Sequence, residues 1–432
     1  MNLKIILFLI LLTVFSFDMY TLVLIWQQRK KPLPKRVEHI YSKERYQEFI
    51  AYKKDGRKIY ILNRLFTLAF DTFVIFSPFF TYFDDPNPYV SFFKTFIAIT
   101  LISNTLSLPL DYYSTFYIRE KYGLNKQSKK DFFKDFFIGL ILNSIIMVLL
   151  ASFIIFVGEH LSVWTNNFNI TYAQSTLLVA VITLALFGVG IIISLISLLS
   201  LRLQYHFTEL EDGPLRSKIE AFLKESKKKV AHIKVYDESK KSTSKNAFLL
   251  RLLGYREFGI ADNFLDENSE DELLAVLLHE IGHLKHKKDI LDYTKYLIIA
   301  LELIVLIFLL ANANIAIAII EYIQSSFNLN YINYYLIMAV ISNFKRPLST
   351  LYDIFDNYRS CTQEKEADFN AVNHGYGQAL IDTFTKLSSD ELIDINPHPL
   401  IVLLKHDHPS MVQRITYIDE QMEHLSKQIS EQ

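Results

Sequence analysis

The segment QSTLLVAVITLALFGVGIIISLISLLS at residues 174–200 contains no charged residue. It is long enough to cross a lipid bilayer as a helix, which takes ~20 residues. Six further apolar runs lie at residues 3–26, 65–83, 91–111, 136–157, 293–322 and 331–356. The composition agrees with these runs, because 51% of the residues are hydrophobic and 14% are aromatic. The sequence therefore predicts a mainly α, polytopic membrane protein with seven transmembrane helices.

The loops between these runs predict an orientation. Basic loops at residues 27–49 and 119–130 alternate with loops that hold no Lys or Arg, at residues 84–90, 158–173 and 323–330. Short loops rich in Lys and Arg stay on the cytoplasmic side of a membrane. We therefore expect the N-terminus outside, and the polar segments 201–292 and 357–432 at the cytoplasmic face of either a bacterial cytoplasmic membrane or the endoplasmic reticulum.

The same pattern divides the chain into two regions. Residues 1–200 form an N-terminal membrane region with five transmembrane helices, and residues 201–432 contain the polar segments together with the last two spans. Ionisable residues lie within or at the ends of several spans, where lipid contact would be costly, so they are expected to face a watery interior. For Lys94, Lys345 and Arg346 the alternative is that they extend from the span ends to the interface.

Net charge and cysteine content exclude several kinds of site. The formal net charge is −1, which gives no indication of a nucleic-acid partner. The single cysteine, Cys361, rules out an internal disulfide and a structural zinc site of the multi-cysteine type. Any metal must therefore be held by nitrogen and oxygen ligands.

A metal-binding helix is predicted after Asn268. Ser269 and Glu272 have the spacing of a capping box, which marks a helix start. His279 and His283 are four residues apart and hence on one face of this helix, as two imidazoles must be to share one ion. Glu280 is offset from that face and is placed to act as a general base on a water molecule at the metal.

A third ligand is expected from the segment at residues 360–368. Glu364 and Asp368 would share one face of a helix there. One of them can bind the metal while the other orients a ligand histidine. The residues alone do not choose between the two. Glu366 lies on another side of such a helix and is expected in solvent.

At these motifs the chain resembles the type I CAAX prenyl endopeptidase family, together with the related HtpX heat-shock proteases. The sequence HEIGHLKHKKD at residues 279–289 is similar to the family's metal helix, and Glu364 to Asp368 is similar to its ExxAD motif. The resemblance implies Glu364 as the third zinc ligand and Asp368 as the partner of a ligand histidine. Cys361 stands where the family usually has Arg, so that contact is either missing or supplied by Arg359.

Other segments resemble the CAAX branch of this family. They are LPLDYYSTFYIREKYGLNKQS at residues 108–128, the segment around 207–213, the edge strand near 240–248 and the closing motifs at 396–399 and 406–414. The resemblance implies that Asn246, Ala247 and Phe248 pair with the substrate backbone. It implies His408, with Arg414 as a further candidate, as a stabiliser of the oxyanion; the alternative is that His408 caps the turn before Pro409. It also implies seven helices around a chamber, and a cytoplasmic-face metalloprotease domain with a small β-sheet.

We therefore expect a zinc-dependent endopeptidase, with one Zn²⁺ per chain, that acts on prenylated or membrane-associated peptides. Glu280 would be the general base. Two alternatives stay open: an HtpX-like protease that removes faulty membrane proteins without prenyl specificity, and a non-catalytic transporter or scaffold with a structural metal motif. The sequence does not indicate the oligomeric state.

Overall fold

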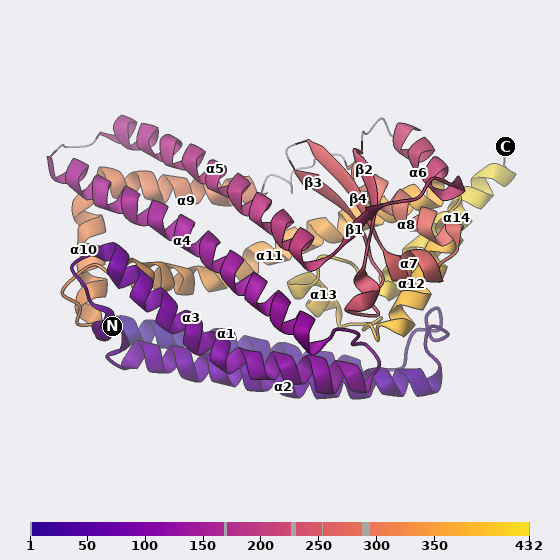
Figure 1. Ribbon diagram of the computed structural model, residues 1–432, viewed down its shortest axis with the longest axis horizontal. Helices are drawn as coiled ribbons and strands as arrows, with labels where there is room; N and C mark the ends of the chain where they lie inside the picture. The colour runs from indigo at the N-terminus through magenta and orange to yellow at the C-terminus, as the bar shows by residue number, and fades with distance from the viewer. Residues whose placement is uncertain (1, 168–170, 226–229, 253, 287–293, 432) are drawn as a thin grey trace.

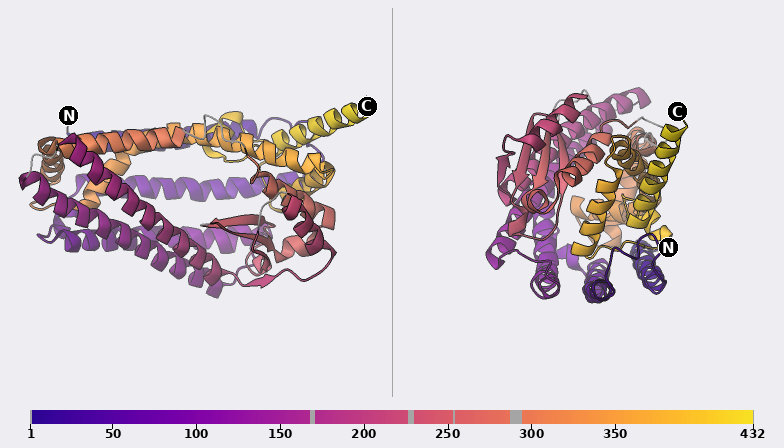
Figure 2. Two further views of the ribbon diagram at one scale, coloured as in Figure 1. Left: turned by 90° about the horizontal axis from the view of Figure 1, so that it is seen from above. Right: turned by 90° about the vertical axis from the view of Figure 1, so that its right-hand side faces the viewer.

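A computed structural model of the 432-residue chain describes residues 2–167, 171–225, 230–252, 254–286 and 294–431. The molecule is elongated, with a bundle of long helices at one end and a compact region holding a small sheet at the other (Figure 1; Figure 2). The N-terminus lies at the far end of the bundle from the sheet (Figure 1). This arrangement is the mainly α membrane fold with a small β-sheet that the sequence predicts.

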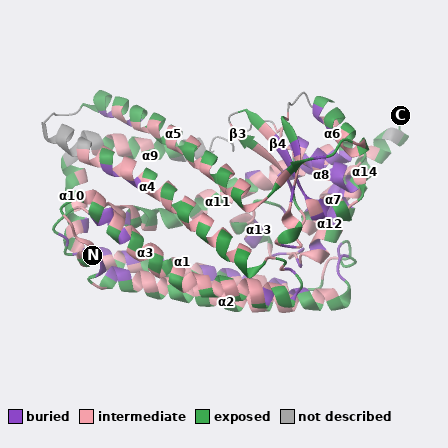
Figure 3. Cartoon of the chain, viewed as in Figure 1, coloured by how far each residue is buried: buried purple, intermediate pink, exposed green. Residues whose placement is uncertain are grey.

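Five long helices form most of the bundle, and each is apolar enough to cross a membrane. They are α1 (Leu3–Gln28), α2 (Lys43–Phe76), α3 (Pro88–Tyr113), α4 (Lys129–Asn167) and α5 (Tyr172–Gln204). Short helical turns follow α2 and α3, namely η1 (Phe79–Phe83) and η2 (Ser114–Arg119). Ser42 begins α2 by accepting a hydrogen bond from the Arg45 N–H, and Thr171 with Gln174 forms a capping box at α5. Large apolar side chains on α5 stay exposed (Figure 3), as expected for a lipid-facing surface.

The sixth apolar run is broken, so the prediction of one continuous helix over 293–322 was wrong in detail. It forms α9 (Thr294–Ala311) and α10 (Ala313–Ser326), which meet at Asn312 with an angle of 95° between them. Residue 293 lies outside the described residues. The bent pair counts as a sixth span if its two arms act together.

The seventh run belongs to a longer helix than expected. α11 (Tyr334–Asn373) is 40 residues long and continues through Pro347 into the segment that carries Glu364. The last predicted span and the third predicted ligand therefore lie on one helix. α11 contacts α1, α3 and α8, so it connects the bundle to the compact region.

Several ionisable residues of the bundle face its interior or each other. A cavity of about 310 Å³ is lined by Asp71, Asn343 and Arg346 among mostly apolar residues of α1, α2, α4 and α11. Lys94 Nζ lies 2.9 Å from Asp85 Oδ2 at the start of α3. Asp71, which is half-buried, and Arg346 both line this cavity, in agreement with the expectation that charged side chains in the spans avoid lipid.

The compact region contains a four-stranded sheet of order β1-β2-β4-β3. Its strands are β1 (Phe207–Glu209), β2 (His232–Tyr236), β3 (Ala247–Leu252) and β4 (Tyr255–Ala261). β2 and β4 are parallel, whereas β1 and β3 run antiparallel to their neighbours. β3 pairs with β4 only, so it is an edge strand of the sheet that the described residues form.

Helix α8 (Glu270–Gly282) is the centre of this region. Leu274, Leu277 and Ile281 pack on the sheet, while Ala275 and Leu278 face the opposite cluster, which includes residues of α11 and α12. The region is completed by six further helices: α6 (Pro214–Glu225), η3 (Glu238–Lys240), α7 (Asp262–Glu267), α12 (Gly377–Asp390), α13 (Pro399–Lys405) and α14 (Met411–Ser430). The metal-binding helix is therefore held rigidly on both faces, which a precise site requires.

Candidate metal centre

Local sequence signals set both ends of α8. Ser269 Oγ accepts from the Glu272 N–H at 3.3 Å, and the Glu272 carboxylate accepts from the Ser269 N–H at 2.8 Å, so the predicted capping box is present. The helix ends at Gly282, earlier than the basic residues at 285–288 suggested, and His283 is its C-cap. Of those basic residues, 287 and 288 lie outside the described part of the chain.

The two histidines of α8 face one point. Their Nε2 atoms are 3.1 Å apart, and the ring centroids of His279 and His283 are 4.7 Å apart. Such a close pair of ring nitrogens on one helix face is suited to binding one ion.

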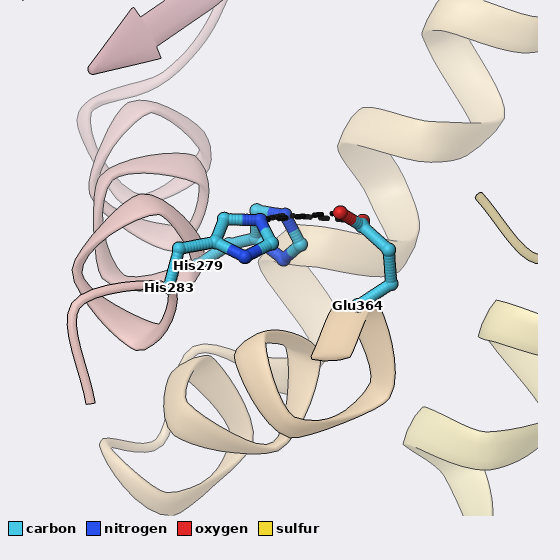
Figure 4. A group of neighbouring side chains, drawn as sticks. All are labelled: His279, His283 and Glu364. Atoms are coloured by element: carbon cyan, nitrogen blue, oxygen red, sulfur yellow. Dashed lines mark hydrogen bonds and ion pairs between the residues drawn. The ribbon is translucent and has the colours of Figure 1, made fainter. Parts of the chain in front are cut away.

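Glu364 of α11 completes the group, as Figure 4 shows. Its Oε2 lies 3.4 Å from His279 Nε2, and its Oε1 lies 3.2 Å from His283 Nε2. One ligand atom from each of the three residues lies within 4.8 Å of the others. Glu364 Oε2 is buried without a hydrogen-bond partner in the described structure, so it is available to a cation. Two nitrogens and one oxygen fit the donor set of a catalytic zinc site.

Asp368 lies behind His279. Its Oδ1 is 2.9 Å from His279 Nδ1, on the opposite side of the ring from Glu364. Arg414 of α14 donates to both carboxylate oxygens of Asp368, at 2.9 and 2.6 Å. The geometry therefore separates the two acidic residues that the sequence could not distinguish: Glu364 faces the ring nitrogens of both histidines, and Asp368 faces only the outer nitrogen of one.

The charges of this cluster shift its pKa values strongly. Burial alone would lower the pKa of His279, but its contacts with the carboxylates of Asp368 and Glu364 outweigh this effect and raise the pKa to about 9. Burial would likewise raise the pKa of Glu364, but His279, His283 and Arg414 hold it well below its usual range. A metal ion at this point would compete with a proton for His279, because an imidazole binds metal only in its neutral form.

The remaining predicted residues surround this cluster. Glu280 is half-buried and follows His279 on α8. Burial would lower the pKa of Arg414, but the charges of Asp368, Glu364 and, to a smaller extent, Glu280 raise it. His408 Nε2 lies 3.4 Å from Glu364 Oε1, and its Nδ1 lies 2.7 Å from Asp407. The His408 side chain is 55% exposed, whereas Arg414 is buried against Asp368. His408 is thus at the open side of the cluster and Arg414 at its closed side.

The predicted substrate strand lies at the sheet edge. Ala247 pairs with Ile260 of β4 and Phe248 pairs with Gly259, while the Asn246 carbonyl accepts from the Ala261 N–H at 2.9 Å. Helix α8 contacts β3 directly. Ala247 and Phe248 therefore lie on an edge strand beside the metal helix and Asn246 directly precedes it, although none of the three belongs to the metal cluster.

Two residues near the cluster were missed from the sequence. His286 Nε2 lies 2.9 Å from His283 Nδ1, and His286 Nδ1 lies 2.7 Å from Glu366 Oε2. The Glu366 side chain is 45% exposed, which agrees with the expectation that it contacts solvent, but its carboxylate also contacts His286. The signal was present in the third histidine of HEIGHLKH. Two residues before Cys361, buried Arg359 lies 3.9 Å from Glu366.

Gly282 allows α8 to approach α11. A Cβ atom built on Gly282 would lie 2.6 Å from the Cα of Ala367, a backbone atom that cannot rotate away. Replacing Gly282 with Ala is therefore expected to destabilise the fold by ~1–3 kcal/mol and to move Glu364 away from the histidines. Thermal unfolding in detergent measures this effect. Gly56→Ala is the matched control, because nothing lies within 4 Å of a Cβ at that helical position. A Gly282→Ala protein as stable as the wild type would contradict the close contact.

Two family models match the chain. The model "CAAX prenyl protease N-terminal, five membrane helices" matches residues 22–196, and the model of peptidase family M48 matches residues 209–422. The chain belongs to peptidase family M48. It is therefore an enzyme, a membrane metallopeptidase of the CAAX prenyl protease 1 type, and not the transporter or scaffold kept as an alternative.

Individual relatives of this M48 peptidase agree with that assignment. The CAAX prenyl protease 1 homolog of Arabidopsis thaliana is 26% identical over 407 residues, covering 90% of both chains. The probable CAAX prenyl protease 1 of Schizosaccharomyces pombe is 28% identical over 415 residues, covering 90% of this chain and 82% of the relative. The crystal structure of S. mikatae Ste24p superposes with a TM-score of 0.77 at 23% identity, over 97% of this chain and 99% of the other. This likeness confirms the fold.

Proposed function

We propose that this M48 peptidase is a zinc-dependent endopeptidase that hydrolyses prenylated or membrane-associated peptides. The observation that carries the proposal is the cluster of His279, His283 and Glu364, with Glu280 on the same helix as the two histidines. The ligand types favour zinc among the metals of hydrolytic sites.

Each residue of the cluster has a proposed task in hydrolysis. Zinc, when bound there, would polarise the scissile carbonyl and lower the pKa of water to ~7. Glu280 takes the proton of the attacking water and passes it to the leaving amine. His408, whose Nε2 faces the cluster from its open side, donates to the developing oxyanion. Asp368 and Arg414 hold the His279 ring in place from behind.

The substrate is proposed to bind as an extended strand along Asn246, Ala247 and Phe248. An edge strand offers unpaired backbone groups, so a peptide can add to the sheet through main-chain hydrogen bonds. This mode gives affinity with little demand on side chains. Selection by a prenyl group would then depend on apolar contacts elsewhere on the membrane region.

The prenyl preference can be tested with two peptides that differ only in a farnesyl group on cysteine. We expect purified protein to cleave the farnesylated peptide with a kcat/KM at least about tenfold higher, which needs only ~1.4 kcal/mol of additional transition-state binding. Glu280→Gln protein, assayed in parallel, corrects for contaminating peptidases. Equal rates would defeat the prenyl preference and favour a general membrane quality-control protease.

The catalytic face is proposed to be cytoplasmic. The basic loops at residues 27–49 and 119–130 support this orientation. In right-side-out vesicles of a bacterial cytoplasmic membrane, whose interior is the cytoplasmic side, external protease is expected to spare residues 201–292 until detergent is added. Digestion of this segment by protease added outside intact vesicles would show that the orientation is the opposite of the proposed one.

A further inference from the structure

The two ligand histidines are supported in different ways. Both turn Nε2 toward Glu364, so Nδ1 is the outer nitrogen of each ring. A histidine that binds metal usually donates its other ring N–H to a carboxylate, a carbonyl or water, which fixes the tautomer and the ring orientation. For His279 that partner is Asp368, at 2.9 Å. For His283 it is another imidazole, His286, also at 2.9 Å.

We propose that His286 and Glu366 are positioning residues for the metal ligand His283, forming a His–His–carboxylate chain that runs from the metal cluster to the protein surface. This inference rests on the proposed metal site but adds two residues to it.

The direction of the hydrogen bonds follows from the metal-facing atom. If His283 presents the Nε2 lone pair to the ion, its proton is on Nδ1 and is donated to His286 Nε2. His286 must then carry its own proton on Nδ1, which lies 2.7 Å from Glu366 Oε2. Each ring is therefore held in one tautomer, and the series of hydrogen bonds ends at the Glu366 carboxylate, which accepts a hydrogen bond without carrying a proton itself. With both rings neutral, no other placement of the protons lets His283 Nε2 face the ion, His283 Nδ1 bind His286 Nε2 and His286 Nδ1 bind Glu366.

The packing around His286 explains why the two rings meet. The helix ends at Gly282, and the next residues form a turn in which the Lys285 N–H donates to the Gly282 carbonyl at 2.8 Å. Lys285 Nζ lies 2.9 Å from Asn370 Oδ1, and Asn370 Nδ2 donates to the Leu278 carbonyl at 2.6 Å. The turn is thus fixed to α11, the helix that also carries Glu364.

Burial distinguishes this support from that of His279. The His286 side chain is 12% exposed, and Glu366 is 45% exposed, whereas Asp368 is fully buried and paired with Arg414. A partly solvated carboxylate interacts more weakly through space than a buried one. Loss of Glu366 is therefore expected to have a smaller effect than loss of His286.

Direct measurement of zinc affinity tests the proposal. Wild type and variants would be titrated in detergent against a competing chromogenic chelator, with zinc content checked by elemental analysis. His286→Leu is expected to weaken zinc binding by ~10–100-fold, the usual effect of removing such a partner. Glu366→Ala is expected to weaken it by a smaller factor. His286→Gln, whose amide oxygen can accept from His283 Nδ1–H, is expected to restore most of the affinity.

The matched control is an exposed histidine–carboxylate pair on the sheet, outside the metal cluster. His232 Nδ1 lies 2.8 Å from Glu209 Oε1, and both side chains are 46% exposed, so His232→Leu should leave zinc affinity unchanged. If His286→Leu and Glu366→Ala both bind zinc as tightly as this control, the proposal is overturned.

Further outcomes separate this inference from the proposed function. Wild-type protein that binds no zinc would overturn the metal site itself, whereas tight wild-type binding that is insensitive to both variants overturns only the role of His286 and Glu366. His286→Gln no better than His286→Leu would reduce His286 to a packing residue. Should His286→Leu fail to fold, the Glu366→Ala variant decides, because the Glu366 side chain is 45% exposed and its removal leaves no cavity in the core.

Discussion

Replacing Glu280 with Gln is expected to lower peptidase turnover by ~10²–10⁴-fold, the range that a positioned general base supplies. Gln has the shape of Glu but cannot accept a proton from water. Glu280 is outside the His279–His283–Glu364 cluster, so zinc stoichiometry should stay at the wild-type value. Turnover of a peptide substrate and elemental analysis of the same preparation measure the two effects.

Asp271→Asn is a suitable control for the Glu280 variant. Asp271 is exposed in the first turn of the same helix and has no place in the metal cluster. Its loss should cost at most ~1 kcal/mol of stability through the helix dipole and leave turnover unchanged. Glu280→Gln protein that retained wild-type turnover with zinc bound would remove Glu280 as the base and reopen the assignment of the whole mechanism.

The sequence predicted those parts of the site that depend on local geometry. A helix fixes the direction of side chains four residues apart, so His279 and His283 could be placed together without knowing the rest of the fold. The capping box that starts this helix is equally local. Glu364 could not be chosen over Asp368 from spacing, because 89 positions separate His279 from Asp368 and only tertiary packing decides which carboxylate faces which nitrogen.

The membrane region shows the same limit. Apolar length predicted the existence of the helices α1 to α5, because in lipid a span must satisfy its own backbone hydrogen bonds as a helix. It did not predict the bounds of α2, which begins at Lys43 and ends at Phe76, whereas the apolar run covers residues 65–83. The bend at Asn312 was not predicted, since the run at residues 293–322 contains no Pro or Gly to mark a break. The predicted run at residues 331–356 already included Pro347, which membrane helices tolerate. What was not predicted is that the same helix, α11, continues past this run to Asn373.

His286 and Glu366 were missed for a related reason. Their contact requires both the end of α8 at Gly282 and the docking of the following turn on α11. The longer helix that the basic residues at 285–288 suggested implied no such turn. A hydrogen bond that depends on where a helix ends cannot be derived while the end is uncertain by a few residues.

Replacing Glu364 with Ala is expected to abolish metal binding, so that zinc content falls from one ion per chain to near zero and peptidase activity is lost with it. The two histidines that remain do not supply the three protein ligands of a catalytic zinc site. The fold should survive, because Asp368 and Arg414 keep their mutual pair at 2.6 Å. Elemental analysis and thermal unfolding in detergent measure these two results. The control is Glu423→Ala, which removes an exposed carboxylate of α14.

Asp368→Ala gives the contrasting result that assigns the two carboxylates. Arg414 is 6% exposed and donates to both oxygens of Asp368, so removing the carboxylate leaves a buried cation without its main partner. Breaking such a pair typically costs ~3–5 kcal/mol. We therefore expect Asp368→Ala to unfold at a markedly lower temperature, whereas Glu364→Ala loses its metal but keeps the stability of the metal-free protein. If Glu364→Ala retained full zinc content, the carboxylate that faces both Nε2 atoms would not be a ligand. The proposed hydrolytic site would then be without its third protein ligand.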